Sequence, residues 1–349
     1  MKKSNSIPML PAFKRFINES KSGRRLKPNG TKFKSTTVSC YSSVLNSLEE
    51  FANETEDELV IYLRKGQSKK SLMAEKKYWQ LFYWNYTRFL YRKGCFDGYV
   101  GMQVKVIRVF LGYLKTAKSI TIGDHYKQFY VCKPENPVLV LSIEQLQFLM
   151  WNEPFLATIP DFLMTARDIF VFGCAVGLRM ADLKSLKRQN LVFEAGKHYL
   201  LKKSQKTDTD TRIKLPDFCF DIIKKYKNKQ PTLLPTQSLA NFNGNLKKLG
   251  EYAGWTWIVG KERQIQGKSK LIRTKRGKEY RFCDLMSSHM MRRTAITTMI
   301  LLGMPESLVR KISGHAAGSK EFYRYVKYTQ NYLDEHTDAV FHKLAEVRN

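Results

Sequence analysis

The chain has 349 residues, enough for about two domains of roughly 100–200 residues each. Its hydrophobic fraction of 43%, with 21 Phe and 18 Tyr, supplies a sizeable core and excludes wholesale disorder. Sixty Lys and Arg against 31 Asp and Glu give a formal charge of +29 spread along the chain, which indicates a polyanionic partner, with nucleic acid the first candidate.

The N-terminal third is predicted to be helical after a basic start. Residues 1–34 are poorly periodic and rich in Lys and Arg, so we expect an extended basic arm. Apolar residues then recur at helical spacing from Val38 to Phe51, and further helices are predicted from Ser71 to Gly94 and from about Tyr99 to Lys118. The apolar side of the Ser71 helix is expected to carry Met73, Tyr78, Leu81, Phe82, Phe89 and Leu90. Residues 35–125 therefore indicate a small all-α domain.

Residues 126–140 contain two prolines and no helical period, which predicts a linker. Ser142 and Gln145 form a capping box that begins the next helix, and a long apolar helix is predicted from Asp161 to Val176. Leu191 to Leu215 indicates strands with turns at 195–196 and 205–211. The basic stretch 260–282 is either a contact to a polyanion or a solvated hairpin. The second part of the chain is thus mostly helical with a small sheet.

The six cysteines are scattered, without a C-x-x-C pair or a histidine at zinc-finger spacing: Cys40, Cys95, Cys132, Cys174, Cys219 and Cys283. No stretch approaches the roughly 20 apolar residues that a membrane helix needs, and the first residues lack the apolar core of a secretory signal. We therefore expect reduced thiols in a cytoplasmic protein.

Two segments in the middle of the chain hold cationic residues that could belong to a functional site. Arg179 follows the long apolar helix at Gly177, which permits a sharp reversal, although a surface arginine at a helix junction would look the same. Lys206 lies at the tip of the predicted turn, where it can place an ammonium beside a phosphate. Turn lysines are usually only solvated, and Lys202 and Lys203 compete for the role.

The segment from Ser287 to Tyr328 contains the residue types that attack a phosphodiester without a metal. His289 and Arg292 are one helical turn apart, near a helix start that favours an anion. His315 follows a glycine, although a lone histidine is more often structural. Arginine holds the phosphate charge, histidine moves protons and a tyrosine hydroxyl is the nucleophile. The tyrosines that follow, most of which should pack, are Tyr323, Tyr325, Tyr328 and Tyr332.

Five segments in this order, GLRMADL, QKT, HMMRRT, SGH and FYRYVK, resemble the tyrosine recombinases of the phage-integrase family, and look most like integrases of mobile genetic elements. The resemblance covers roughly residues 140–345. It implies a mainly α protein with a small antiparallel β-sheet, built as a two-domain DNA clamp. An all-α, SAM-like core-binding domain at 35–125 would precede the 126–140 linker and a mixed α/β catalytic domain with a C-terminal tail at 141–349.

The resemblance also implies a role for each site residue. Arg179 and Arg292 would clamp the scissile phosphate, and Lys206 would be the general acid toward the leaving 5′-oxygen. His289 would assist proton transfer at the tyrosine, and His315 would donate to a non-bridging oxygen. Attack by the tyrosine would give a 3′-phosphotyrosyl bond and a free 5′-hydroxyl. A second 5′-hydroxyl would reverse the attack, so no cofactor, ATP or metal is required.

The nucleophile departs from the family spacing. It usually lies nine residues after the histidine of the Gly-His pair, and that position is Arg324 here. Alignment of F-x-x-Y-x-K instead selects Tyr325, flanked by Phe322 and Lys327, with Tyr323 as the rival. The 34 residues ahead of the helical domain are also too few for the arm-site-binding domain of many element integrases.

The partners implied are double-stranded DNA with inverted-repeat core sites, further copies of the chain as a dimer to tetramer on DNA, and accessory DNA-bending or directionality proteins. No membrane is implied, and the expected location is a bacterial cytoplasm, at the nucleoid. Three alternatives remain open: a type IB topoisomerase, a non-catalytic DNA-binding protein, and a metal-dependent nuclease, which would need clustered carboxylates. The C-terminal segment AVFHKLAEV would dock on a neighbouring protomer or pack on its own core.

Overall fold

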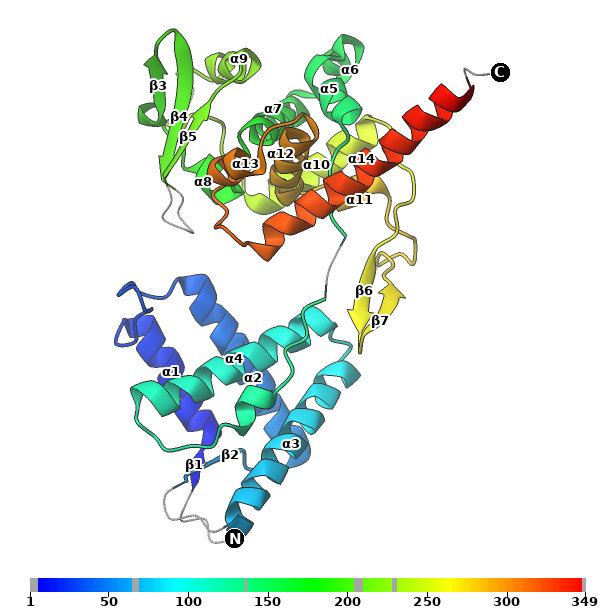
Figure 1. Cartoon of the computed structure of the whole chain (residues 1–349). Helices are drawn as coiled ribbons and strands as arrows, with labels where there is room; N and C mark the ends of the chain where they lie inside the picture. Colours follow the sequence, from blue (N-terminus) through cyan, green and yellow to red (C-terminus); the bar gives the residue numbers. More distant parts are fainter. Residues whose placement is uncertain (1–5, 65–68, 135–136, 204–209, 228–230, 347–349) are drawn as a thin grey trace. The chain divides into compact units, whose positions relative to one another are not determined.

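The computed structural model describes residues 6–64, 69–134, 137–203, 210–227 and 231–346. Over these ranges the chain is mainly helical with three small antiparallel sheets, which confirms the predicted fold class. The chain divides into two compact units (Figure 1). Unit 1 comprises residues 1–136 and 262–271, and unit 2 comprises residues 137–261 and 272–349.

Unit 1 is a helical bundle with two short β-ribbons. Its elements are β1 (Ser6–Pro8), α1 (Met9–Ser22), α2 (Ser35–Thr55), β2 (Val60–Tyr62), α3 (Lys69–Arg92), α4 (Asp97–Ala117), the 3-10 turn η2 (His125–Gln128), β6 (Glu262–Ile265) and β7 (Lys268–Leu271). β1 pairs antiparallel with β2, and β6 with β7. The core is rich in aromatic rings, which supply large apolar surface area to a small unit.

The N-terminal residues do not form the extended arm that we predicted. α1 is a helix whose Met9, Phe13 and Phe16 are buried in the core of unit 1. The Phe13 ring centroid lies 4.6 Å from that of Phe110 on α4. These apolar residues recur at helical spacing, but the prolines and lysines between them hid the period. The helical unit therefore includes α1, and only residues 23–34 form a basic loop.

The predicted apolar side of α3 is partly wrong. Met73 and Leu81 are 75% and 47% exposed. The helix instead turns Glu75 inward, where its carboxylate accepts hydrogen bonds from Arg64 Nε at 3.3 Å and from the Gly123 N–H at 3.1 Å. A buried carboxylate must be paired or hydrogen-bonded, so this group fixes the rotation of the helix. The predicted linker also begins later, because Tyr126 and Phe129 are buried in unit 1.

The basic stretch 260–282 contains the β6–β7 hairpin, which folds as part of unit 1. At its tip the main-chain N–H groups of Gln266 and Gly267 donate to the Asp97 carboxylate at 2.7 and 2.8 Å. The Tyr91 hydroxyl donates to the same carboxylate at 2.9 Å. Burial alone would raise the pKa of Asp97, but the hydrogen bonds from Gly267, Tyr91 and Gln266 bring it below its ordinary value.

Unit 2 surrounds the long helix α7 with other helices. Its elements are α5 (Ile143–Trp151), α6 (Glu153–Thr158), α7 (Asp161–Val176), α8 (Met180–Lys184), the 3-10 turn η3 (Arg188–Asn190), β3 (Leu191–Glu194), β4 (Lys197–Lys203), β5 (Asp210–Lys214), α9 (Asp217–Lys225), α10 (Leu239–Tyr252), α11 (Phe282–Leu285), α12 (Ser288–Leu301), α13 (Glu306–Ser313) and α14 (Lys320–Glu346). α7 contacts α5, α9, α10 and α12. The sheet has the antiparallel order β3-β4-β5.

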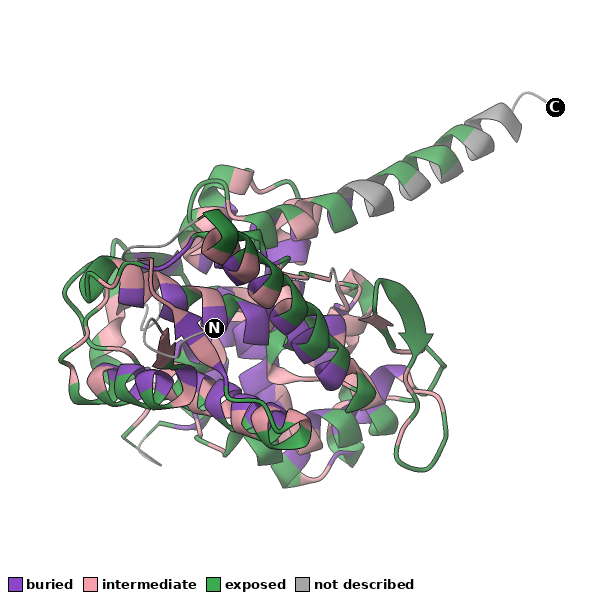
Figure 2. Cartoon of the chain, turned by 90° about the horizontal axis from the view of Figure 1, so that it is seen from below, coloured by how far each residue is buried: buried purple, intermediate pink, exposed green. Residues whose placement is uncertain are grey.

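Several local predictions for unit 2 are confirmed. The Ser142–Gln145 capping box is present, and α7 has the predicted bounds. Figure 2 shows buried and exposed residues on different sides of the helices. All six cysteines are free thiols, three of them buried.

Among the described residues, none of the helices is both long and apolar enough to cross a membrane. Phe341 on α14 is exposed, so whether this tail docks on a second protomer stays a prediction.

Candidate active site

Close packing of α7 against α12 sets the position of the site. A Cβ added at Gly173 of α7 would lie 2.2 Å from Sδ of Met291 on α12, so only glycine allows this approach. Met291 is buried, and close-packed interiors hold few voids that could accept a displaced side chain. The next residue, Arg292, is thereby brought to the C-terminal end of α7.

The end of α7 positions Arg179. Gly177 caps the helix in the left-handed conformation, with φ of +64°, and its N–H donates to the Gly173 carbonyl at 3.0 Å. This conformation favours glycine because a Cβ would clash with the backbone. The chain reverses there, and Arg179 occupies the N-cap position of α8. The predicted sharp reversal at Gly177 is confirmed.

Arg292 is the most buried cation of the site, with 3% of its surface exposed. Its Nη1 donates to the Gly177 carbonyl at 2.9 Å, and its Nη2 donates to the Ser313 carbonyl. The side chain thus joins α12 to the ends of α7 and α13. Burial, and then the nearby charge of Arg179, lower the pKa of Arg292 to about 10, so the guanidinium is still charged at neutral pH.

His315 lies beside Arg292. Gly314 ends α13 in the left-handed conformation, with φ of +60°, and brings the imidazole back to the end of that helix. Nε2 of His315 is 3.3 Å from Nη2 of Arg292, and Nδ1 is 2.8 Å from the hydroxyl oxygen of Ser313. Burial, followed by the charges of Arg292 and Arg179, lowers the pKa of His315 to about 4. The imidazole is therefore neutral near pH 7.

Tyr325 on α14 faces the same site, whereas its rival does not. The Tyr325 ring is 6% exposed, and its centroid lies 6.0 Å from that of His315. Tyr323 is 50% exposed. Phe322 is buried with Ile296 and anchors the first turn of α14. Of the two candidate nucleophiles, the structure brings Tyr325 to the histidine and leaves Tyr323 facing outward.

The other three candidate site residues are Arg179, His289 and Lys206. The charge of Arg179 influences the pKa of both Arg292 and His315, and the charge of His289 influences that of His315. These four side chains therefore share one electrostatic environment. Lys206 lies outside the described residues, in the connection between β4 and β5.

The start of α12 is capped by a residue of another helix. Ser287 occupies the N-cap position, but its side chain makes no capping hydrogen bond. Instead, the N–H of Ser288 donates to Oδ1 of Asn243 on α10 at 2.8 Å. Asn243 was not predicted, because a cap supplied from 45 residues away leaves no local sequence pattern. Within the described ranges, His, Cys, Asp and Glu side chains form no group of three or more that could hold a metal ion.

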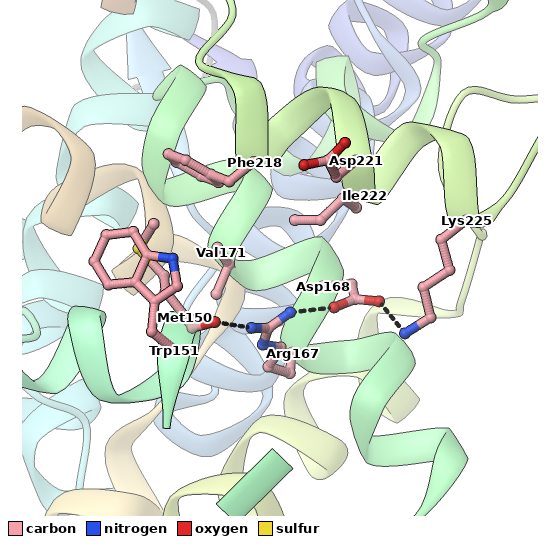
Figure 3. A pocket seen from close by; sticks show the side chains of 9 residues that line it. All are labelled: Met150, Trp151, Arg167, Asp168, Val171, Phe218, Asp221, Ile222 and Lys225. Carbon is pink, nitrogen blue, oxygen red and sulfur yellow. Dashed lines mark hydrogen bonds and ion pairs between the residues drawn. The ribbon is translucent and has the colours of Figure 1, made fainter. Parts of the chain in front are cut away.

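A separate pocket of about 260 Å³ lies between α5, α7 and α9, and Figure 3 shows its lining. Three of its charged groups, Arg167, Asp168 and Lys225, form one network. The Asp168 carboxylate, which is buried, accepts from Arg167 at 2.6 Å, Lys225 at 2.9 Å and the Tyr226 hydroxyl at 2.7 Å. Arg167 also donates to the Met150 carbonyl at 2.6 Å. This network ties α7 to its neighbouring helices and is distinct from the cluster around Arg292.

Residues 155–332 match the sequence profile of the phage integrase family. No curated protein matches the chain. A lambda integrase tetramer bound to a Holliday junction has a similar fold, with 13% identity and a TM-score of 0.58 over 92% of this chain and 81% of that chain. The XerH site-specific recombinase in a pre-cleavage complex with difH has 14% identity and a TM-score of 0.54, over 91% and 92% of the two chains. The Tn1549 transposon integrase bound to transposon right end DNA has 14% identity and a TM-score of 0.59, over 95% and 100%.

Proposed function

The chain belongs to the phage integrase family, and we propose that the cluster around Arg292 is the site at which it cleaves DNA. The protein is a tyrosine site-specific recombinase, which breaks and rejoins DNA strands through a phosphotyrosyl intermediate. The single observation that supports the location of the site is the contact chain Arg292–His315–Tyr325. In it a fixed cation, a neutral imidazole and a tyrosine ring lie next to one another, which supports the proposal that they act on one phosphate.

The arginines would hold the scissile phosphate. Arg292 is fixed by two carbonyl groups and cannot swing away, and Arg179 lies close enough to lower its pKa. Two cations this near repel each other, and an anion between them would relieve that repulsion. Their N–H groups would stabilise the charge that develops on the non-bridging oxygens in the transition state.

Tyr325 would attack the phosphorus through its hydroxyl oxygen. A bond from that oxygen to phosphorus forms, the bond to the 5′-oxygen breaks, and a 3′-phosphotyrosyl link results. His289 would assist removal of the hydroxyl proton, His315 would bind a non-bridging oxygen, and Lys206 would protonate the leaving 5′-oxygen. Attack by a second 5′-hydroxyl restores the phosphodiester and releases the tyrosine.

The biological substrate would be double-stranded DNA with inverted-repeat core sites, used to integrate or excise a mobile element. Lambda integrase is a tetramer on a Holliday junction in one of the structures described above. We propose that this chain likewise acts as a homo-oligomer, dimer to tetramer, on DNA. We also propose a cytoplasmic location at the bacterial nucleoid, and a clamp in which the two units contact the same duplex.

The test is covalent trapping of the chain on nicked duplexes taken from any site beside its gene at which inverted repeats flank a short spacer. Wild-type protein should form an adduct that survives denaturant, in the presence of EDTA. Tyr325→Phe should form none, because phenylalanine keeps the packing and removes the hydroxyl. Tyr323→Phe is the matched control and should retain the adduct. An adduct with Tyr325→Phe would refute the assignment of the nucleophile.

Two further measurements separate the alternatives. Joining of two DNA sites distinguishes a recombinase from a type IB topoisomerase, which would relax a supercoiled plasmid without joining sites. Wild-type protein that binds DNA but forms no adduct on any flanking duplex would indicate a non-catalytic DNA-binding protein.

A further inference from the structure

The basic loop of unit 1, residues 23–34, has a defined conformation. The N–H of Gly30 donates to the Lys27 carbonyl, and the N–H of Lys27 donates to the Thr31 carbonyl, both at 2.9 Å. The Thr31 hydroxyl donates to Oδ1 of Asn29 at 2.8 Å. These bonds close a turn around an asparagine and a glycine. The cations of the loop are therefore carried on an ordered backbone.

Arg25 fastens this loop to the helices beside it. Its guanidinium carbon lies 4.3 Å from the ring centroid of Phe16 on α1, 4.2 Å from that of Phe33 in the loop, and 5.2 Å from that of Tyr113 on α4. Its Nη1 donates to the hydroxyl of Ser20 at 3.0 Å. A planar guanidinium stacks on rings in a way that an ammonium cannot. Arg25 therefore holds the loop against α1 and α4.

A groove of about 730 Å³ lies between the basic loop and α4. Arg24, Lys27 and Lys118 line it, together with the carboxylate of Glu19. Glu19 already binds Lys118 at 2.8 Å and the Tyr113 hydroxyl, and the hydrogen bond from Lys118 is the main cause of its lowered pKa. Among the described residues, no carboxylate lies within ion-pair distance of Arg24 or Lys27. The charge of Arg24 also helps to lower the pKa of Glu19, but this one carboxylate faces four lining cations, so the groove keeps a net positive charge.

Apolar side chains stand between these cations. Leu26 and Val109 are exposed large hydrophobic residues, and both line the groove with Pro28. The sugar-phosphate backbone of DNA has the complementary alternation, since each charged phosphate is followed by a deoxyribose with an apolar face. An acidic protein segment would match the cations but would not require the apolar residues between them.

We propose that this groove binds the DNA backbone, with Arg24 and Lys27 on phosphate oxygens and deoxyribose against Leu26 and Val109. Arg25 is a positioning residue, which holds the loop without contacting DNA. The inference rests on the proposed function in taking DNA as the partner. The contacts are to the backbone, so they set affinity and register and carry no base specificity.

The experiment measures binding of the full chain to a fluorescein-labelled duplex of arbitrary sequence at several KCl concentrations. Each lost phosphate contact lowers the slope of log K against log[KCl] by about 0.9. In the double variant Arg24→Gln/Lys27→Gln, which loses two such contacts, the magnitude of this slope should therefore be smaller than in wild type by nearly 2. The control, Lys14→Gln/Lys93→Gln, removes the same charge from unit 1, but these lysines already pair with Glu49 and Glu50. The control should change the slope much less, and equal slopes for the two double variants would overturn the proposal.

Two more variants test the positioning role. Arg25→Lys keeps the charge and loses the stacking, so its slope should fall toward that of the double variant, and trypsin should cleave the loop faster. If Arg25→Lys does not fold, as judged by circular dichroism, Phe33→Leu removes one ring of the stack and should have the same effect. A wild-type slope in a folded Arg25→Lys or Phe33→Leu would overturn the positioning role.

The remaining outcomes separate this proposal from the proposed function. If the double variant binds DNA as wild type does but no longer binds a polyglutamate peptide, the groove serves an acidic protein and the proposal is wrong. Tyr325 is untouched in the double variant, so adduct formation at saturating protein should persist. If the wild-type protein forms no adduct while the salt slopes differ as expected, the proposed cleavage site is refuted and the proposal that the groove binds DNA is supported.

Discussion

Arg292 and His315 meet at 3.3 Å, from Nη2 of the arginine to Nε2 of the histidine, and Ser313 contacts both side chains. The Ser313 hydroxyl donates to the Val309 carbonyl at 2.6 Å, so its oxygen is left to accept a hydrogen bond from the protonated Nδ1 of His315. Nε2 then carries no proton and accepts from Arg292. In the free protein His315 is therefore neutral, with its tautomer set by Ser313.

This relationship predicts how stability depends on pH. The pKa of His315 is about 4 in the folded protein and about 6.5 in an unfolded chain, so the unfolded chain binds more protons between these values. Stability should fall as the pH drops from about 6.5 to about 4. His315→Gln lacks this titration, so the loss over the same window should be smaller. Urea unfolding of both proteins across this pH range measures the difference, and parallel curves would contradict the predicted charge state.

The contact between Gly173 and Met291 predicts a strong effect of a single methyl group. In Gly173→Ala the added carbon would lie 2.2 Å from Sδ of Met291, so the buried Met291 side chain or α12 itself must shift. Overpacking of this kind costs about 1–3 kcal/mol. Because Arg292 follows Met291, adduct formation should fall as well.

The control for this prediction is Gly244→Ala. Gly244 lies inside α10, and a Cβ there would meet nothing within 4 Å. Alanine should then stabilise the helix by about 0.5–1 kcal/mol. Urea unfolding and adduct yield are measured for both variants. A Gly173→Ala protein as stable as Gly244→Ala would show that α7 and α12 do not pack as closely as described.

The ion pair between Asp168 and Lys225 in Figure 3 predicts that replacing each partner lowers the stability by a different amount. Asp168→Asn should cost about 3–5 kcal/mol, because the charge of Arg167 would lose its buried partner. Lys225→Met should cost less than about 1 kcal/mol, since the lysine side chain is 47% exposed and largely hydrated. Thermal unfolding measures both. Equal losses would mean that the lysine, and not the arginine, is the main partner of Asp168.

The sequence predicts best what depends on neighbours along the chain. The Ser142–Gln145 box, the bounds of α7 and the reversal at Gly177 rest on short spacings, and all are present. The order of motifs also selected Arg292, His315 and Tyr325, which lie together in the structure, although their roles remain proposals. The role of Lys206 also remains a prediction.

The features that were missed depend on contacts between distant segments. In α1 prolines and lysines masked the helical spacing of the apolar residues, and their burial depends on partners such as Phe110 of α4. The cap of α12 comes from Asn243 on another helix. The exposure of Met73 follows from burial of Glu75, which requires Arg64 and Gly123 as partners. No local spacing encodes such pairings.

Asp97 gives the most specific test of a contact that the sequence did not reveal. Its carboxylate accepts two main-chain N–H groups from the tip of the β6–β7 hairpin. Asp97→Asn would turn one acceptor into a donor that faces a second donor, at a cost of about 1–3 kcal/mol. The folded pKa of Asp97 is lowered, so its contribution is present above the unfolded pKa of about 3.9 and is lost as the pH falls through the folded value.

The measurement is amide hydrogen exchange of Gln266 and Gly267 together with urea unfolding. In Asp97→Asn both amides should exchange faster, and trypsin should cut the hairpin sooner at Lys268 and Lys270, which are exposed. Asp124→Asn is the control, because that carboxylate forms only exposed ion pairs with Lys115 and Lys127. Exchange at Gln266 and Gly267 that is the same in Asp97→Asn as in this control would mean that Asp97 does not hold the hairpin to α4.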